Sequence, residues 1–149
     1  LIFQKKFIHH FFLEQVGTFD PYQKVEAETM AWGYGLKTAV SKKHGIYLTN
    51  INDGETLTLR GVDFGKKGAK IFTTELASAE GGCWIEIRLD SAEGPMVGKL
   101  DIPATGGPKE FRKFSCPVKD AKGVHDLVFV FRGKDQTDLM SWNRWEFAR

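Results

Sequence analysis

Short apolar runs separated by turn-forming residues constrain the fold of this chain more than any other feature. Several runs alternate apolar and polar residues, as residues 83–90 do, and this alternation is typical of a strand with one buried face. No run keeps the 3.6-residue spacing over the length of a helix. Many short strands with regular turns therefore predict an all-β sandwich or barrel. The expected strands cover residues 46–51, 55–60, 69–77, 83–90, 97–102, 110–116, 124–132 and 140–147.

The length and charge of the chain limit the kinds of partner that it can have. The 149 residues are 42% hydrophobic and 27% charged, which is typical of one globular domain. The formal charge of +2 is too small to indicate a nucleic-acid partner, because electrostatic binding of nucleic acid needs a clustered basic surface. No run approaches the ~18 apolar residues of a membrane span. We therefore expect neither nucleic acid nor a membrane as a partner. The two cysteines, Cys83 and Cys116, fit a disulfide and a pair of buried thiols equally well.

The first residues of the chain are predicted to lie outside the globular part. Gly and Pro punctuate residues 15–22, as at a domain boundary, so we assign residues 1–21 to a linker or upstream remnant and residues 22–149 to the module. Residues 7–13 follow two lysines, which imitates a signal peptide. Their apolar core is short, contains two histidines and lacks a small-residue cleavage site. We interpret them as a remnant, or as aromatics that pack on a neighbouring domain.

Two carboxylates, Glu26 and Glu28, stand two residues apart near the start of the module. On a strand they would share one face, about 7 Å apart. Like charges in this position repel unless a cation lies between them. A glycosidase pair, by contrast, faces across a cleft, as a rule from separate elements. The spacing favours a hard-cation site, with a solvated carboxylate pair and a catalytic pair as the alternatives.

A set of short motifs in a fixed order resembles a known family. These motifs are Glu-Ala-Glu at 26–28, Leu-Asp-Ser at 89–91, Thr-Gly-Gly at 105–107, Gly-Val-His-Asp-Leu at 123–127 and an aromatic strand at 142–147. Together they resemble family 6 carbohydrate-binding modules, of the kind appended to family 43 glycoside hydrolases. The resemblance implies a β-sandwich of the jelly-roll type. It also implies a non-catalytic, extracellular or periplasmic module, expected to be monomeric, that binds xylan or a related plant cell-wall β-glycan and targets a tethered glycoside hydrolase.

The same resemblance implies a structural Ca²⁺. Its ligands would be Glu26, Glu28, a backbone carbonyl near Lys43, and Asn143 in the last strand. The family more often has an aspartate at this last position. The side-chain carbonyl of Asn143 can still bind the ion, with the loss of one negative charge.

The family's usual sugar cleft is expected to be weak in this chain. Where the family has two aromatic rings and an asparagine at the loop rim, this sequence has Asn50, Pro108 and Ser141. The usual pair of rings around one sugar cannot form from these residues. Three nearby aromatic residues could substitute for the missing rings, with core or edge packing as the alternative role for each. They are Trp32, Tyr34 and Tyr47.

A second candidate surface is the polar face of the strand at 83–90. Cys83, Ile85, Ile87 and Leu89 should enter the core, which places Trp84, Glu86 and Arg88 on the other face. An exposed tryptophan beside a carboxylate and a guanidinium has the composition of a sugar platform. The alternative is a cross-strand salt bridge with Trp84 capping the edge of the sheet.

Two further expectations concern the end of the chain and the function. Trp142 and Trp145 have opposite parities, so one of them should face inward, and either could be a core residue. The rival to a binding module is a calcium-stabilised β-sandwich with a decayed sugar site, which docks against a catalytic domain.

Overall fold

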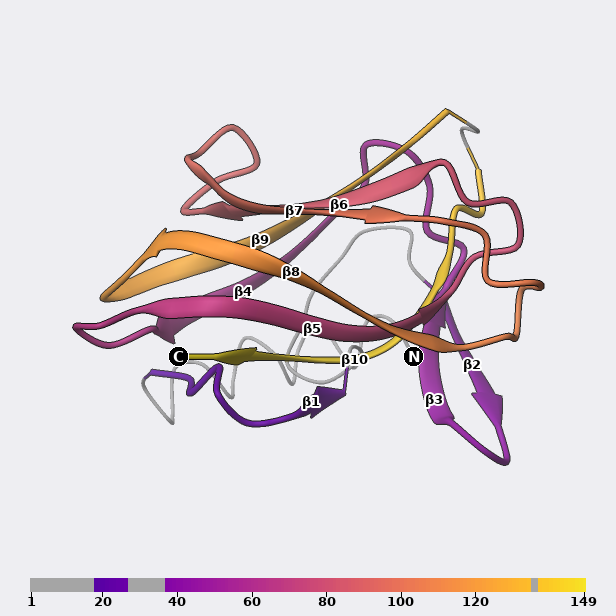
Figure 1. The fold of residues 1–149 in the computed structure, drawn as a ribbon, viewed down its shortest axis with the longest axis horizontal. Helices are drawn as coiled ribbons and strands as arrows, with labels where there is room; N and C mark the ends of the chain where they lie inside the picture. The colour runs from indigo at the N-terminus through magenta and orange to yellow at the C-terminus, as the bar shows by residue number, and fades with distance from the viewer. Residues whose placement is uncertain (1–17, 27–36, 135–136) are drawn as a thin grey trace.

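The computed structural model describes residues 18–26, 37–134 and 137–149, and these form two antiparallel β-sheets packed face to face (Figure 1). One sheet has the order β2-β3-β10-β5-β8, with β1 also paired to β10, and the other has the order β4-β9-β6-β7. The described residues contain no helix, so none that could span a membrane. The predicted all-β sandwich is confirmed. The strands are β1 (Val25–Glu26), β2 (Lys37–Ser41), β3 (Gly45–Thr49), β4 (Thr56–Asp63), β5 (Ala69–Ala77), β6 (Cys83–Leu89), β7 (Met96–Ile102), β8 (Arg112–Ala121), β9 (Val124–Gly133) and β10 (Ser141–Ala148).

All eight strands expected from the apolar runs are present, and the structure adds β2, which those runs did not predict. β2 lies at the edge of its sheet and forms a hairpin with β3. None of its residues is buried, and Val40 is 75% exposed. A strand that buries so little of its surface has no need of alternating apolar residues, so its sequence gives no such signal.

The core lies between the two sheets and is rich in aromatic rings. From β6, Cys83, Ile85, Ile87 and Leu89 enter it, as predicted. From the opposite sheet come Phe72, Trp145 and Phe147, whose rings stack in tilted and edge-on pairs. Such pairs add to the burial of their apolar area. The two faces of β6 are therefore firmly assigned, with its polar face outside the sandwich.

β10 contains a β-bulge, and both of its tryptophans face inward, whereas their opposite parities predicted this of one. Trp142 pairs with Leu76 of β5, while Arg144 pairs with the next residue, Glu75, so Asn143 is inserted between them. The extra residue resets the alternation of side chains. Trp142 and Trp145 are consequently both buried, at 0% and 2% exposure.

Cys83 and Cys116 are buried thiols rather than a disulfide in this structure, which decides between the two alternatives that the sequence left open. Burial raises the pKa of the Cys116 thiol.

Residues ahead of Tyr22 already join the packed fold. Phe19 exchanges backbone hydrogen bonds with Gly61 and Asp63, and its ring centroid lies 6.4 Å from that of Trp145.

Thr74 of β5 links two parts of β10 and provides a test of this packing. Its hydroxyl donates to the carbonyl of Arg144 and accepts from the indole N–H of Trp142. Thr74→Val should lower the free energy of unfolding by about 2 kcal/mol, because it leaves the buried indole N–H of Trp142 without its acceptor. Urea denaturation measures this change.

The matched control is the neighbouring residue, Thr73, whose hydroxyl bonds to Ser115 at an exposed position. Thr73→Val should change the free energy of unfolding by no more than about 0.5 kcal/mol. Equal losses for the two variants would contradict the role assigned to Thr74.

Candidate functional site

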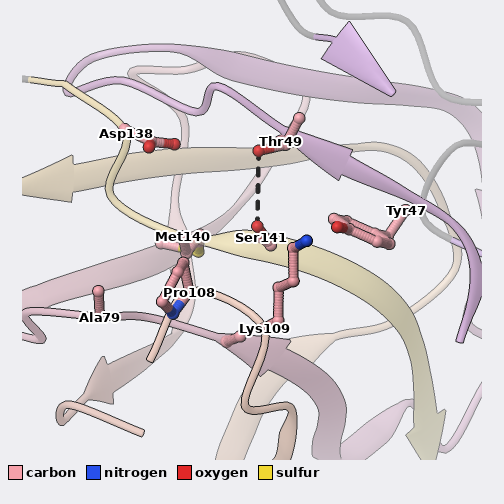
Figure 2. Close-up of a pocket in the computed structure, with 9 residues that line it drawn as sticks. Tyr47, Thr49, Ala79, Pro108, Lys109, Asp138, Met140 and Ser141 are labelled. Carbon is pink, nitrogen blue, oxygen red and sulfur yellow. Dashed lines mark hydrogen bonds between the residues drawn. The ribbon is translucent and has the colours of Figure 1, made fainter. Parts of the chain in front are cut away.

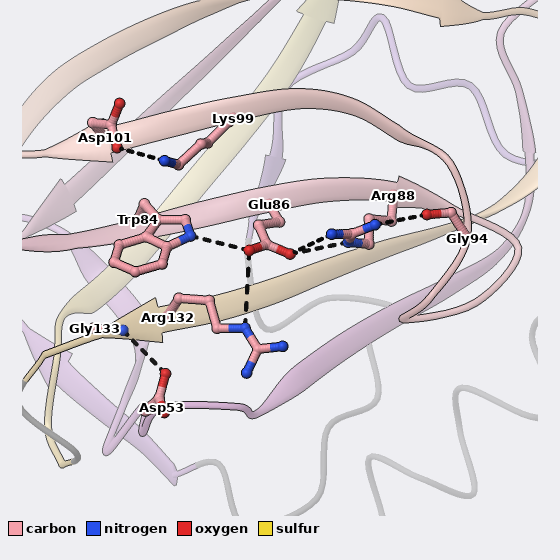
Figure 3. Close-up of polar contacts among 9 residues, drawn as sticks. All are labelled: Asp53, Trp84, Glu86, Arg88, Gly94, Lys99, Asp101, Arg132 and Gly133. Carbon is pink, nitrogen blue, oxygen red and sulfur yellow. Dashed lines mark hydrogen bonds and ion pairs between the residues drawn. The ribbon is translucent and has the colours of Figure 1, made fainter.

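The outer face of the four-stranded sheet brings Trp84, Glu86 and Arg88 together (Figure 3). Glu86 accepts a hydrogen bond from the Trp84 indole N–H at 3.1 Å and one from Arg88 Nε at 3.0 Å. A second guanidinium nitrogen of Arg88 lies 2.9 Å from the same carboxylate oxygen as Nε. The carboxylate thus fixes both neighbours on its own strand.

Two adjacent strands complete this surface. Arg132 of β9 places Nε 3.9 Å from Glu86, and the Lys99 ammonium of β7 lies 4.9 Å from the Trp84 ring centroid. Asp101 is paired with Lys99 at 3.5 Å. Trp84 is therefore half-buried, with a cation over its ring, rather than exposed as predicted. It does not cap a sheet edge either, because β6 lies between β9 and β7.

Glu86 is a charged acceptor at neutral pH. Burial alone would raise its pKa, but hydrogen bonds from Trp84 and Arg88 and the charges of Arg88 and Arg132 lower it overall. Its side chain is only 14% exposed. The carboxylate holds the indole in one orientation and leaves the more exposed Arg132 and Lys99 available to a ligand.

A pocket of about 130 Å³ opens at the rim, beside the ends of β3, β5 and β10 (Figure 2). This is smaller than the 300–1,000 Å³ usual for small-molecule sites. Of the three positions expected at the family's cleft, Pro108 and Ser141 line the pocket and Asn50 does not. The complete lining consists of Tyr47, Thr49, Ala77, Ala79, Pro108, Lys109, Asp138, Met140 and Ser141.

Tyr47 is the single aromatic residue of this lining, and it offers little ring surface. It is only 4% exposed, and its ring packs edge-on against Phe111 at 5.1 Å. The other two aromatic candidates, Trp32 and Tyr34, lie outside the described residues. Lys109 and Asp138, which the sequence analysis missed, contribute polar groups to the pocket. The described part of the rim thus has hydroxyls and charges but no open aromatic platform.

The bulge in β10 creates a third polar centre around Asn143. This side chain is fully buried, and its Nδ2 donates to Glu75 Oε1 at 2.7 Å. Its Oδ1 is also buried and has no hydrogen-bond partner in the described structure. A buried carbonyl oxygen without a partner is unfavourable, and a hard cation that prefers oxygen ligands satisfies such a group.

The other predicted cation ligands approach the same region only in part. The backbone of Glu26 pairs with Arg144, the residue next to Asn143, whereas the side chain of Glu26 and all of Glu28 lie outside the described residues. Lys43 occupies the turn between β2 and β3, beside His44, whose Nδ1 is 3.4 Å from Glu75. In the described ranges no three His, Cys, Asp or Glu residues cluster as metal ligands.

Glu75 is a residue of this centre that the sequence analysis missed. Burial raises its pKa, but the hydrogen bond from Asn143 and the contacts with Arg144 and His44 lower it overall. Glu75 is therefore a carboxylate at neutral pH. Its position in β5, among apolar residues and threonines, is the signal that could have drawn attention to it.

Comparison with known proteins gives consistent matches over most of the chain. The sequence profile of carbohydrate binding module (family 6) matches residues 26–149. An arabinoxylan arabinofuranohydrolase of Paenibacillus polymyxa is 38% identical over 91% of this chain and 22% of its own length. One from Bacillus subtilis is 39% identical over 91% of this chain and 27% of its own. The chain thus spans about a quarter of these relatives.

Solved structures agree with the sequence matches. A glycoside hydrolase family 43 arabinoxylan arabinofuranohydrolase from Bacillus subtilis, in complex with cellotetraose, aligns with a TM-score of 0.85 and 37% identity, over 90% of this chain and 28% of that one. A family 6 module from Clostridium cellulolyticum, in complex with xylose, aligns with a TM-score of 0.81 and 30% identity, over 88% and 100% of the two chains. These matches confirm the resemblance found in the sequence: the chain belongs to family 6 of the carbohydrate-binding modules, which are non-catalytic.

Proposed function

We propose that this module binds a β-1,4-linked plant cell-wall polysaccharide, with xylan as the first ligand, on the outer face of β6. The names of the relatives support this ligand, since they include arabinoxylan arabinofuranohydrolases and an endo-1,4-beta-xylanase. Family members were solved with xylose and with cellobiose, so cello-oligosaccharides are the second ligands to test. Mixed-linkage β-glucan follows them.

The observation that carries this proposal is the Trp84 indole, whose N–H is held by Glu86 on the outer face of the four-stranded sheet (Figure 3). The ring offers an apolar surface for the C–H face of a pyranose, while its neighbours supply polar groups for the hydroxyls. Arg132 and Lys99 are the donors within reach of the ring, and both side chains are more exposed than Glu86. The ammonium of Lys99 can move aside or bond to the sugar when a chain stacks on the ring.

A sheet face suits the interior of a long polysaccharide better than the rim pocket does. The Trp84 surface spans three neighbouring strands, whereas the rim pocket is small and its one described aromatic residue, Tyr47, is buried. The module breaks no bond. Its binding would raise the effective concentration of a tethered hydrolase at its substrate.

We further propose that the module belongs to a secreted glycoside hydrolase. The matched relatives are about four to five times as long as the aligned part, and they are named for activity on arabinoxylan and xylan. These polysaccharides are extracellular. We propose that the module acts as a monomer beside its catalytic domain.

We also propose a structural Ca²⁺ bound by Glu26, Glu28, Asn143 and a backbone carbonyl near Lys43. The buried Oδ1 of Asn143 supports this proposal, because it is an oxygen ligand already out of water and without another partner in the described structure. The ion would link the first and last strands of the module. Its contribution would be to stability rather than to chemistry.

Truncation of the ring tests the sugar surface. Trp84→Ala should weaken xylan binding at least about 10-fold, as expected when an interface aromatic residue worth more than 1.4 kcal/mol is removed. Affinity electrophoresis with soluble xylan measures the loss, and a thermal melt checks that the variant is folded. Trp84→Leu serves as a second variant that keeps apolar bulk on the sheet.

Ser141→Ala, at the rim pocket, is the control and should retain wild-type retardation by xylan. The reverse result, in which Ser141→Ala abolishes binding and Trp84→Leu retains it, would move the sugar site to the rim. A wild-type module that xylan, glucan and mannan all fail to retard would support the rival function of docking against a catalytic domain.

Removal of calcium tests the cation site. An ion present at 100 times its dissociation constant stabilises the fold by about 2.7 kcal/mol, which corresponds to several degrees in melting temperature for a chain of this size. EDTA should therefore lower the melting temperature of the wild type by that amount and have little effect on Glu28→Ala. Glu93→Ala removes an exposed carboxylate elsewhere and should keep the full response. A wild-type melting temperature that EDTA leaves unchanged would refute the calcium proposal.

A further inference from the structure

The orientation of the Asn143 amide is determined by its neighbour Glu75. A carboxylate only accepts hydrogen bonds, so the arm of the amide that faces Glu75 must be the NH₂ group. This hydrogen bond, Nδ2 to Oε1, is 2.7 Å long. The opposite arm, Oδ1, then points away from Glu75 into a buried position with no partner in the described structure. One contact thus decides which atom Asn143 presents.

Glu75 is itself held in place from the β2–β3 turn and from β10. His44 in the turn places Nδ1 3.4 Å from its carboxylate, and Arg144 of β10 places Nε 4.0 Å from it. The side chain of Glu75 is only 18% exposed. A carboxylate with these partners keeps its position and its negative charge next to the Nδ2 group of Asn143.

We propose that Glu75 is a positioning residue for the cation. It turns Asn143 Oδ1 toward the ion and supplies, one hydrogen bond away, the negative charge that an aspartate at position 143 would carry. This inference rests on the calcium site proposed above. Partners of this kind, which hold a ligand without touching the ion, are known to tune metal affinity about 10- to 100-fold.

The proposal makes Glu75 and Asn143 a matched pair. An aspartate at position 143 would bring a second carboxylate to hydrogen-bond distance of Glu75, where the present donor–acceptor distance is 2.7 Å. Two carboxylates so close cannot both stay ionised at low cost. The aspartate that the family more often has should therefore be unfavourable in this chain unless Glu75 is neutralised at the same time.

A double-mutant cycle tests the pairing, with Ca²⁺ affinity measured by calorimetry and melting temperature measured in EDTA. Glu75→Gln should weaken Ca²⁺ binding about 10-fold, while the melting temperature in EDTA changes little. Asn143→Asp alone should also bind Ca²⁺ more weakly than the wild type. The double variant Asn143→Asp/Glu75→Gln should recover wild-type affinity or exceed it, because the new glutamine can donate a hydrogen bond to the new aspartate.

Two further variants separate position from charge. Glu75→Asp keeps the charge but shortens the reach to Asn143, and should weaken Ca²⁺ binding as Glu75→Gln does. Glu146→Gln removes a carboxylate from the same strand as Asn143 and should leave the affinity within about twofold, since a more distant charge is screened by solvent.

The outcomes distinguish this inference from the calcium proposal on which it rests. A wild type that binds no Ca²⁺ overturns both. A wild type that binds Ca²⁺, with Glu75→Gln within twofold of it, overturns the role of Glu75 alone. Tighter binding by the single variant Asn143→Asp would equally overturn the pairing. If Glu75→Gln does not fold, Glu75→Asp and the double variant still decide the question.

Discussion

The insertion of one extra residue into β10 is the constraint on which both the core and the candidate cation site depend. Because Asn143 has no counterpart in β5, the strand can bury Trp142 and Trp145 together. Their ring centroids lie 4.9 and 5.3 Å from that of Phe129 in the facing sheet. The same insertion places the amide of Asn143 beside Glu75. Bulges are often found next to functional sites because they re-aim a side chain, and this one also sets the packing of two tryptophans.

The fold was largely predictable from the sequence wherever the signal is local. Residues 83–89 alternate strictly, so their two faces followed from the period of a strand. The two tryptophans of β10 were not predictable in this way. Their orientation depends on pairing with β5, and Asn143 contacts a residue 68 positions away. Strand β2 escaped detection for another reason, because an exposed edge strand buries too little to need a pattern.

The candidate sites show the same division between local and distant information. Trp84, Glu86 and Arg88 share a face because they alternate along one strand, and the sequence shows this directly. Their setting comes from Arg132 and Lys99 on the flanking strands. Those contacts half-bury the indole, which no pattern within β6 could reveal. Glu75 was missed for a related reason: it acts on Asn143, and the hydrogen bond that joins them exists only once β5 and β10 pair.

The two proposed sites lie on different sheets, and this limits how they can influence one another. The Trp84 surface belongs to the four-stranded sheet, and the Asn143 centre belongs to the six-stranded one. Between them lies a packed aromatic core, in which Phe129 of one sheet contacts Trp142 and Trp145 of the other.

A ligand shifts a distant site only as far as it binds two states of the protein differently. Calcium at the first and last strands would favour the folded state over the unfolded one. Within the folded state, the orientation of Trp84 is set by Glu86 and its partners, none of which belongs to the Asn143 centre. Under these two proposals the cation would determine how much of the module is folded, and the sheet face would set the folded module's affinity for polysaccharide.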